Sequence, residues 1–176
     1  RQKGHLELAS ALDDHTNTHP GQACTDVATG IFQHQQKMKN KRQNVIFTLR
    51  KKLNLGNKIL RTNADGDVKQ VIRACEQAVD NMRRLDHIIP GAEVNKVLLE
   101  VYANLNPKEH VDKAKKIFTS LQEISSPAEL IKPFEYLARI CIAAEQVQYV
   151  ANEIQSICET RLFKPSTETF EMIIAG

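Results

Sequence analysis

Large aromatic side chains and turn-forming residues are scarce in this chain of 176 residues. Trp is absent, aromatic residues make up 5% of the chain, and there are only seven Gly and six Pro. A β-rich fold needs many tight turns, so this composition opposes one. Hydrophobic residues nevertheless reach 41%, which is enough to bury a core and excludes wholesale disorder. The composition therefore favours helices packed closely through Val, Ile, Leu and Ala.

Long apolar runs are missing as well. No stretch approaches the roughly 18 consecutive apolar residues that a membrane-spanning helix needs, and no signal-peptide pattern is present. We therefore expect no association with a membrane.

Close cysteine pairs are also absent, since the four Cys are far apart and form no CxxC motif. We expect reduced thiols at buried helical positions rather than a disulfide framework or a zinc site. His15, His19 and Cys24 lack the fourth ligand that a structural zinc needs, so no metal is expected. His34, His87 and His110 are isolated and are expected on the surface. The cysteines are Cys24, Cys75, Cys141 and Cys158.

Catalytic motifs are not found. The chain has no HExxH motif, no glycine-rich phosphate loop and no nucleophile motif. The acidic pairs Asp13-Asp14 and Asp65-Gly66-Asp67 lie where helices are expected to begin or end, and capping explains them. We expect no catalytic residue and no cofactor, and thus a binding protein rather than a self-contained enzyme.

Acidic residues are absent from Val27 to Ala64, and this absence is the clearest charge signal. The stretch carries a charge of +9, while the chain as a whole carries +3, so the remainder carries −6. Such segregation is typical of a surface that meets a polyanion, although an exposed solvated helix face or a surface for an acidic protein are the alternatives. Phe47 is the only aromatic residue within 37–61, so the segment does not predict a series of stacking aromatics. The basic residues are Lys37, Lys39, Lys41, Arg42, Arg50, Lys51, Lys52, Lys58 and Arg61.

Apolar residues spaced three and four apart predict helices along most of the chain. Asp65 or Asp67, Asn106-Pro107 and Ser125-Ser126-Pro127 are expected to start helices, and Ile89-Pro90-Gly91 to end one. The first third is less regular: we expect short helices over 6–12, 27–31 and 45–53, the last ending near Gly56, and a loop over 15–21. The later apolar stripes run over 68–85, 94–105, 111–121, 134–144, 147–157 and 170–174.

An internal repeat organises the second half of the chain. Val111, Ala114, Phe118 and Leu121 recur 36 residues later as Val147, Val150, Ile154 and Ile157, and Phe134 recurs as Phe170. A single helix pair cannot cover its own apolar face, whereas stacked pairs bury a continuous core. We therefore predict an all-α fold, a right-handed α-solenoid of antiparallel helix pairs over 65–176. It is preceded by an irregular helical N-terminal region over 1–64, which contains the basic segment 37–61. The repeat pattern stops after the first helix of a pair, so we expect more chain after Gly176 or a partner that covers this end.

Residues 92–176 resemble the pentatricopeptide repeat family. The run Phe163-Lys164-Pro165-Ser166-Thr167-Glu168-Thr169-Phe170-Glu171-Met172-Ile173-Ile174-Ala175-Gly176 is similar to the junction between two such repeats. The helix Val111-Asp112-Lys113-Ala114-Lys115-Lys116-Ile117-Phe118-Thr119-Ser120-Leu121 is similar to the second helix of the family's unit. Tetratricopeptide repeats share the helix-pair plan, but their 34-residue period fits less well.

The resemblance implies binding of single-stranded RNA or ribosomal RNA in a mitochondrion, or alternatively a plastid, for RNA processing, stability or translation. The family's base-reading positions match Asn95, Glu135 and Glu171, with Ser166 at a terminal position. Asn is typical at such a position, whereas the two Glu depart from the pattern. A carboxylate only accepts hydrogen bonds and is repelled by phosphates, so it is poorly suited to reading a base. The alternatives are a protein-interaction scaffold, a structural subunit of a mitochondrial ribosome, or the RNA-binding portion of a larger organellar enzyme.

Overall fold

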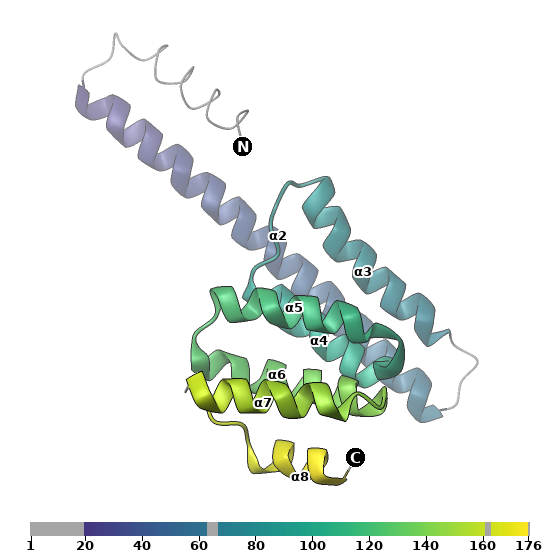
Figure 1. Cartoon of the computed structure of the whole chain (residues 1–176). Coiled ribbons are helices and arrows are strands. Elements are labelled where there is room, and N and C mark those ends of the chain that lie inside the picture. Colours follow the sequence, from purple (N-terminus) through teal and green to yellow (C-terminus); the bar gives the residue numbers. More distant parts are fainter. Residues whose placement is uncertain (1–19, 63–66, 161–162, 176) are drawn as a thin grey trace. The chain divides into compact units, whose positions relative to one another are not determined.

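The computed structural model describes residues 20–62, 67–160 and 163–175. Within these ranges all regular structure is helical and no strand occurs, which confirms the all-α prediction (Figure 1). The chain divides into two compact units, Arg1–Lys41 and Arg42–Gly176. The domain boundary that the sequence predicts after residue 64 is of another kind, because it separates a basic region from the repeats by composition. It stays a prediction. The elements are α2 (Pro20–Thr62), α3 (Val68–Arg84), α4 (Ala92–Leu105), the 3-10 helix η1 (Pro107–His110), α5 (Val111–Ile124), α6 (Pro127–Ala143), α7 (Val147–Thr160) and α8 (Thr167–Ala175).

Helix α2 corrects the expectation for the N-terminal third. Separate helices over 27–31 and 45–53 were predicted, but the structure has one continuous helix that begins at Pro20 and passes through Gly56 to Thr62. Gly56 does not end the helix; it is buried, and a Cβ built on it would lie 2.6 Å from the Cδ atoms of Leu105 in α4. The glycine thus permits close packing of α2 on α4. The helix predicted over 6–12 and most of the loop predicted over 15–21 lie outside the described residues.

Capping side chains begin the helices as predicted at two places. The Asp67 carboxylate accepts a hydrogen bond of 2.9 Å from the backbone N–H of Lys69 at the start of α3. At the start of α6, the Glu129 carboxylate accepts from the backbone N–H of Ser126 at 3.0 Å and from its hydroxyl at 2.8 Å. These bonds satisfy groups that a helix end leaves unpaired. Asn106 differs, because its side chain makes no capping bond and the following proline opens η1 instead of an α-helix.

Two helix ends are formed without the glycine that usually stands there. His87 after α3 and Glu145 after α6 adopt positive φ angles of 53° and 60°. After α6 the N–H of Gln146 donates to the carbonyl of Cys141 at 2.8 Å, which is the bond that closes a helix in this left-handed geometry. Pro133, where a new stripe was predicted to begin, lies inside α6 and is buried there.

The helices from α4 onward in the second unit pack against one another along the chain. Helix α4 contacts α6 and α6 contacts α8, while α5 contacts α4 and α6, and α7 contacts α6 and α8. Helices α5 and α7 therefore occupy equivalent places between successive neighbours (Figure 1). This arrangement is compatible with the helical repeat that the 36-residue period predicts.

Burial follows the repeat. Val111, Ala114, Phe118 and Leu121 are all buried in α5. In α7 the equivalents of Ala114 and Leu121, Val150 and Ile157, are buried, while the other two are half-buried. Repeated apolar positions thus face one continuous core.

The cysteines behave differently from one another. Cys75 and Cys141 are buried, as expected, and burial raises the pKa of each thiol to about 11. Cys158 is exposed, so the prediction of a buried thiol is wrong at that position. The Cys158 side of α7 has no neighbour among the described helices that would cover it. The side chain of Cys24 lies outside the described part.

Candidate nucleic-acid interface

The C-terminal half of α2, from Arg42 to Thr62, has two chemically distinct sides. Ile46, Leu49 and Leu53 recur three and four residues apart and are buried within the second unit. Because a helix turns about 100° per residue, positions 47, 51 and 58 lie on the opposite side, positions 54 and 61 lie at its edge, and position 50 lies between that edge and the buried side. We call this exposed side the basic face. It consists of Phe47, Arg50, Lys51, Asn54, Lys58 and Arg61, all of which are exposed.

The cations of the basic face form no ion pair with the residues that the structure describes. In the described part of the chain, the ion pairs engage other lysines and arginines, and none involves Arg50, Lys51, Lys58 or Arg61. Nor does a side-chain hydrogen bond hold any of these four. The charges of Lys51, Lys58 and Arg61 are therefore available to a polyanion. Arg50 also lines a groove that contains Glu93, Glu100 and Glu129, so its charge is partly balanced there.

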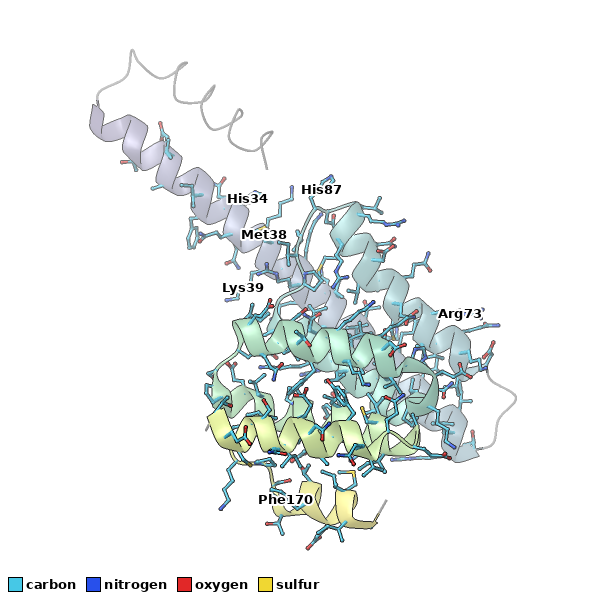
Figure 2. All side chains as sticks on the ribbon, in the orientation of Figure 1. His34, Met38, Lys39, Arg73, His87 and Phe170 are labelled. Carbon is cyan, nitrogen blue, oxygen red and sulfur yellow. The ribbon has the colours of Figure 1, made fainter. Side chains whose placement is uncertain are left out.

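The other predicted basic residues fall into two groups. The Arg42 guanidinium is half-buried and donates from Nη2 to the carbonyl oxygen of Ile89 at 3.2 Å, so it holds the connection between α3 and α4. Lys41 and Lys52 are half-buried, and the charge of Lys52 acts on the thiol of Cys75. Lys37 and Lys39 are exposed on the part of α2 that belongs to the first unit, where Figure 2 labels Lys39.

The expected base-reading positions are mostly engaged in the fold. Asn95 is 4% exposed, and its buried Oδ1 has no hydrogen-bond partner within the described residues. Glu135 is also buried; its carboxylate accepts from Lys132 Nζ at 2.6 Å and from the Ser166 hydroxyl at 3.0 Å. The structure thus brings Glu135 and Ser166 together, and their bond joins α6 to the start of α8. Only Glu171 is exposed, on the same helix as Phe170, which Figure 2 labels.

The surface between α4 and α6 is balanced in charge. A groove of about 340 Å³ there contains three cations and three carboxylates. Lys96 bridges Glu93 and Glu129, at 3.2 Å from each carboxylate. Hydrogen bonds from Ser126, together with Lys96, lower the pKa of the exposed Glu129 carboxyl to about 2. This surface therefore offers a polyanion far less attraction than the basic face does. The charged lining residues are Arg50, Lys96, Lys132, Glu93, Glu100 and Glu129.

A polar cluster joins α3, α4, η1 and α5, and sequence reasoning did not find it. The Glu76 carboxylate accepts from Tyr102 Oη at 2.8 Å and from Lys113 Nζ at 2.7 Å, and His110 Nδ1 lies 3.8 Å away. The His110 and Tyr102 rings stack at 4.6 Å. His110 was expected on the surface, but it is half-buried because Tyr102 covers it. The members lie far apart in sequence, so no local spacing could reveal the cluster.

The pKa values of Glu76 and His110 in this cluster are shifted by burial and by the bonds and charges around Glu76. Burial opposes ionisation of Glu76, but the bonds from Lys113 and Tyr102 outweigh it, and the pKa of the carboxyl is lowered. Burial also lowers the pKa of His110, against the opposing effect of Glu76. The cluster borders a groove of about 680 Å³ between α3 and α5, whose floor includes Asn95, Leu98 and Tyr102.

Comparison with known proteins brings no relative, since no family model, curated protein or solved structure matches this chain. Among the residues that the structure describes, no group of His, Cys, Asp and Glu is placed to hold a metal ion. None of the described helices combines the length and the apolar character that crossing a membrane requires. Function is therefore inferred from the geometry and charge of this chain itself.

Proposed function

We propose that this protein is an organellar RNA-binding protein that acts in RNA processing, stability or translation and binds single-stranded RNA through the basic face of α2. The observation that carries the proposal is a set of four exposed cations of α2, Arg50, Lys51, Lys58 and Arg61, that form no ion pair with any described residue. They belong to a segment without any acidic residue. Each cation that neutralises a phosphate releases counterions, which favours binding at low salt.

The helix pairs of the second unit act, in this proposal, as a right-handed α-solenoid that presents α2. Support comes from the equivalent places of α5 and α7 and from the family resemblance of 92–176. The mitochondrion, or alternatively a plastid, is proposed as the location on that resemblance alone. Since Glu135 and Ser166 bond to each other, the proposal assigns the main RNA contact to α2 and not to base reading by the repeats.

The test is charge reversal at two exposed positions, with the double variant Lys51→Glu/Lys58→Glu. We expect at least about tenfold weaker binding to a mixed pool of single-stranded RNA at low salt. The log–log salt slope should also shrink by roughly 1.4, because each lost phosphate contact removes about 0.7 for a single strand. Filter binding or fluorescence anisotropy over a salt series measures both quantities.

A matched control is Lys108→Glu/Lys164→Glu, which changes the net charge equally at two exposed lysines outside the basic face. This control should bind RNA nearly as well as the unchanged protein. Equal losses in both variants would show that overall charge matters and not the basic face. Undetectable binding of the unchanged protein to RNA at low salt would refute the proposal.

A second candidate is a protein-interaction scaffold or a structural subunit of a mitochondrial ribosome. The charge-balanced groove between α4 and α6 favours it, because such a surface suits a protein partner better than a polyanion. Capture of partners from organelle lysate, with and without ribonuclease, distinguishes the two. Partners retained after ribonuclease treatment support the scaffold, and partners lost with the RNA support the first proposal.

A further inference from the structure

Phe47 stands out among the aromatic residues of this protein. Phe118 and Phe134 are buried in the core, whereas Phe47 and Phe32 of α2 are 70% and 66% exposed. Of these two, only Phe47 has cations three and four residues away. It shares the basic face with Lys51, four residues later, and with Arg50, three residues later. Side chains at these separations are neighbours on a helix surface, with Cβ atoms about 5–6 Å apart. The phenyl ring is thus an exposed apolar surface flanked by two cations that form no ion pair in the described part of the chain.

We infer that Phe47 stacks on an unpaired base of a single-stranded nucleic acid whose phosphates lie along Arg50, Lys51, Lys58 and Arg61. This inference rests on the proposed function and specifies the form of nucleic acid bound. An aromatic ring stacks on the face of any base, and such a contact is sequence-tolerant. In a duplex the base faces are already stacked on one another, so Phe47 gives a preference for unpaired strands that charge alone does not.

The dimensions of the basic face suit this mode of binding. At a rise of about 1.5 Å per residue, Arg61 lies about 21 Å along the helix axis from Phe47, and Lys51 lies about 6 Å from it. The ring is therefore at one end of a row of cations rather than between two equal rows. A strand that follows the row places one base on Phe47 and several phosphates beside Lys51, Lys58 and Arg61.

An acidic protein is the competing occupant of the same face. It would satisfy the cations and cover Phe47 equally well, but it has no reason to require a nucleobase. Removal of the bases from the probe, with the phosphates retained, therefore separates the two occupants. An RNA oligomer of mixed sequence and an abasic oligomer of equal length and charge form the required pair of probes.

The chain has no Trp, so the variant Phe47→Trp introduces a single tryptophan, whose fluorescence can be excited selectively, at the position in question. We expect the single-stranded RNA oligomer to quench its fluorescence on binding, because the indole stacks on a base. The abasic oligomer should bind without this quenching. The control is Ile174→Trp, at an 85% exposed position on α8, which should show no quenching with either oligomer.

Affinity gives an independent readout through Phe47→Ala. We expect about tenfold weaker binding to the single-stranded oligomer and a change of less than about twofold for an RNA duplex. The position is exposed, so the circular dichroism spectrum should be unchanged. Phe47→Trp should retain the affinity of the unchanged protein because the larger ring also stacks.

The outcomes separate this inference from the proposed function. RNA binding by Phe47→Trp without quenching would overturn the stacking contact and leave the basic face intact as an electrostatic site. Equal quenching by the abasic oligomer, or quenching by an acidic polypeptide with no RNA binding, would overturn it as well. Loss of all RNA binding in the unchanged protein would instead refute both.

Discussion

At the scale of single residues, Gly56 shows how one missing side chain permits two helices to approach. It lies inside α2, near the end of the helix at Thr62, and glycine inside a helix normally costs about 1 kcal/mol relative to alanine. Glycine is favoured at this position because a Cβ there would lie 2.6 Å from both Cδ atoms of Leu105, which is itself buried. Contact between α2 and α4 thus outweighs the helical preference of the local sequence.

We predict that Gly56→Ala destabilises the protein by roughly 1–2 kcal/mol. Overpacking costs about 1–3 kcal/mol, and the better helix propensity of alanine offsets up to about 1 kcal/mol. Urea unfolding followed by circular dichroism measures the difference. The control is Gly30→Ala, where nothing lies within 4 Å of the added carbon, and it should not destabilise. Unchanged or raised stability of Gly56→Ala would contradict the close packing of α2 on α4.

At the scale of elements, the cluster around Glu76 connects α3, α4, η1 and α5. Its members face one another from four elements, with Glu76 on α3, Tyr102 on α4, His110 on η1 and Lys113 on α5. The buried Nδ1 of His110 has no hydrogen-bond partner within the described residues. This junction is therefore sensitive to the protonation of His110 as well as to that of Glu76.

We predict that acidification weakens the fold in two separate steps. Burial places the pKa of His110 below its ordinary value of 6.5, so the unfolded chain binds more protons and stability falls as the pH drops through that value. The pKa of Glu76 is lowered from 4.5, so its contribution is lost only at a still lower pH. The free energy of unfolding measured across this pH range tests both steps.

The variant His110→Phe isolates the first step, because a phenyl ring can still stack on Tyr102 but cannot be protonated. Between about pH 7 and about pH 5 its stability should depend less on pH than that of the unchanged protein. His34→Phe is the control, since His34 is exposed on α2, and it should retain the original pH dependence. Identical pH profiles for His110→Phe and the unchanged protein would rule out a role for His110.

At the scale of the whole second unit, the core is continuous along the helix pairs. Phe134 of α6 lies 5.7 Å, between ring centroids, from Phe118 of α5 and equally far from Phe163 after α7. It is fully buried and thus connects one helix pair to the next. Helices stacked in this manner depend on their neighbours for burial, so loss of one central contact affects more than one pair.

We predict that Phe134→Ala destabilises α4 to α8 together, by about 3–5 kcal/mol. Hydrogen exchange should show lower protection in α5 and α7 alike, because both pack against α6. Phe170→Ala, at the equivalent but only half-buried position on α8, should cost less. Loss of protection confined to α6 would indicate that the helix pairs are energetically independent.

The sequence alone determined most of the helices and their boundaries. Apolar spacing, Asp67 and Ser126-Pro127 act through residues only a few positions away, so they can be recognised without a tertiary structure. The end predicted at Ile89-Pro90-Gly91 is too late, because α3 ends at Arg84. The 36-residue period is compatible with the structure, in which all four stripe positions of α5 are buried and two of the four in α7. The absence of acidic residues around α2 revealed a basic segment in the same manner.

Only the tertiary structure decided which of these residues are exposed and which are bonded to or covered by neighbours. Arg42 and Lys51 are indistinguishable in the sequence pattern, yet one bonds to the carbonyl of Ile89 and the other is exposed. Gly56 lies inside a helix and packs against Leu105, and it does not end the helix. The ring of His110 stacks on Tyr102, so it is not fully exposed to solvent. Local pattern specifies local conformation, whereas burial, pairing and charge availability depend on neighbours that only folding brings near.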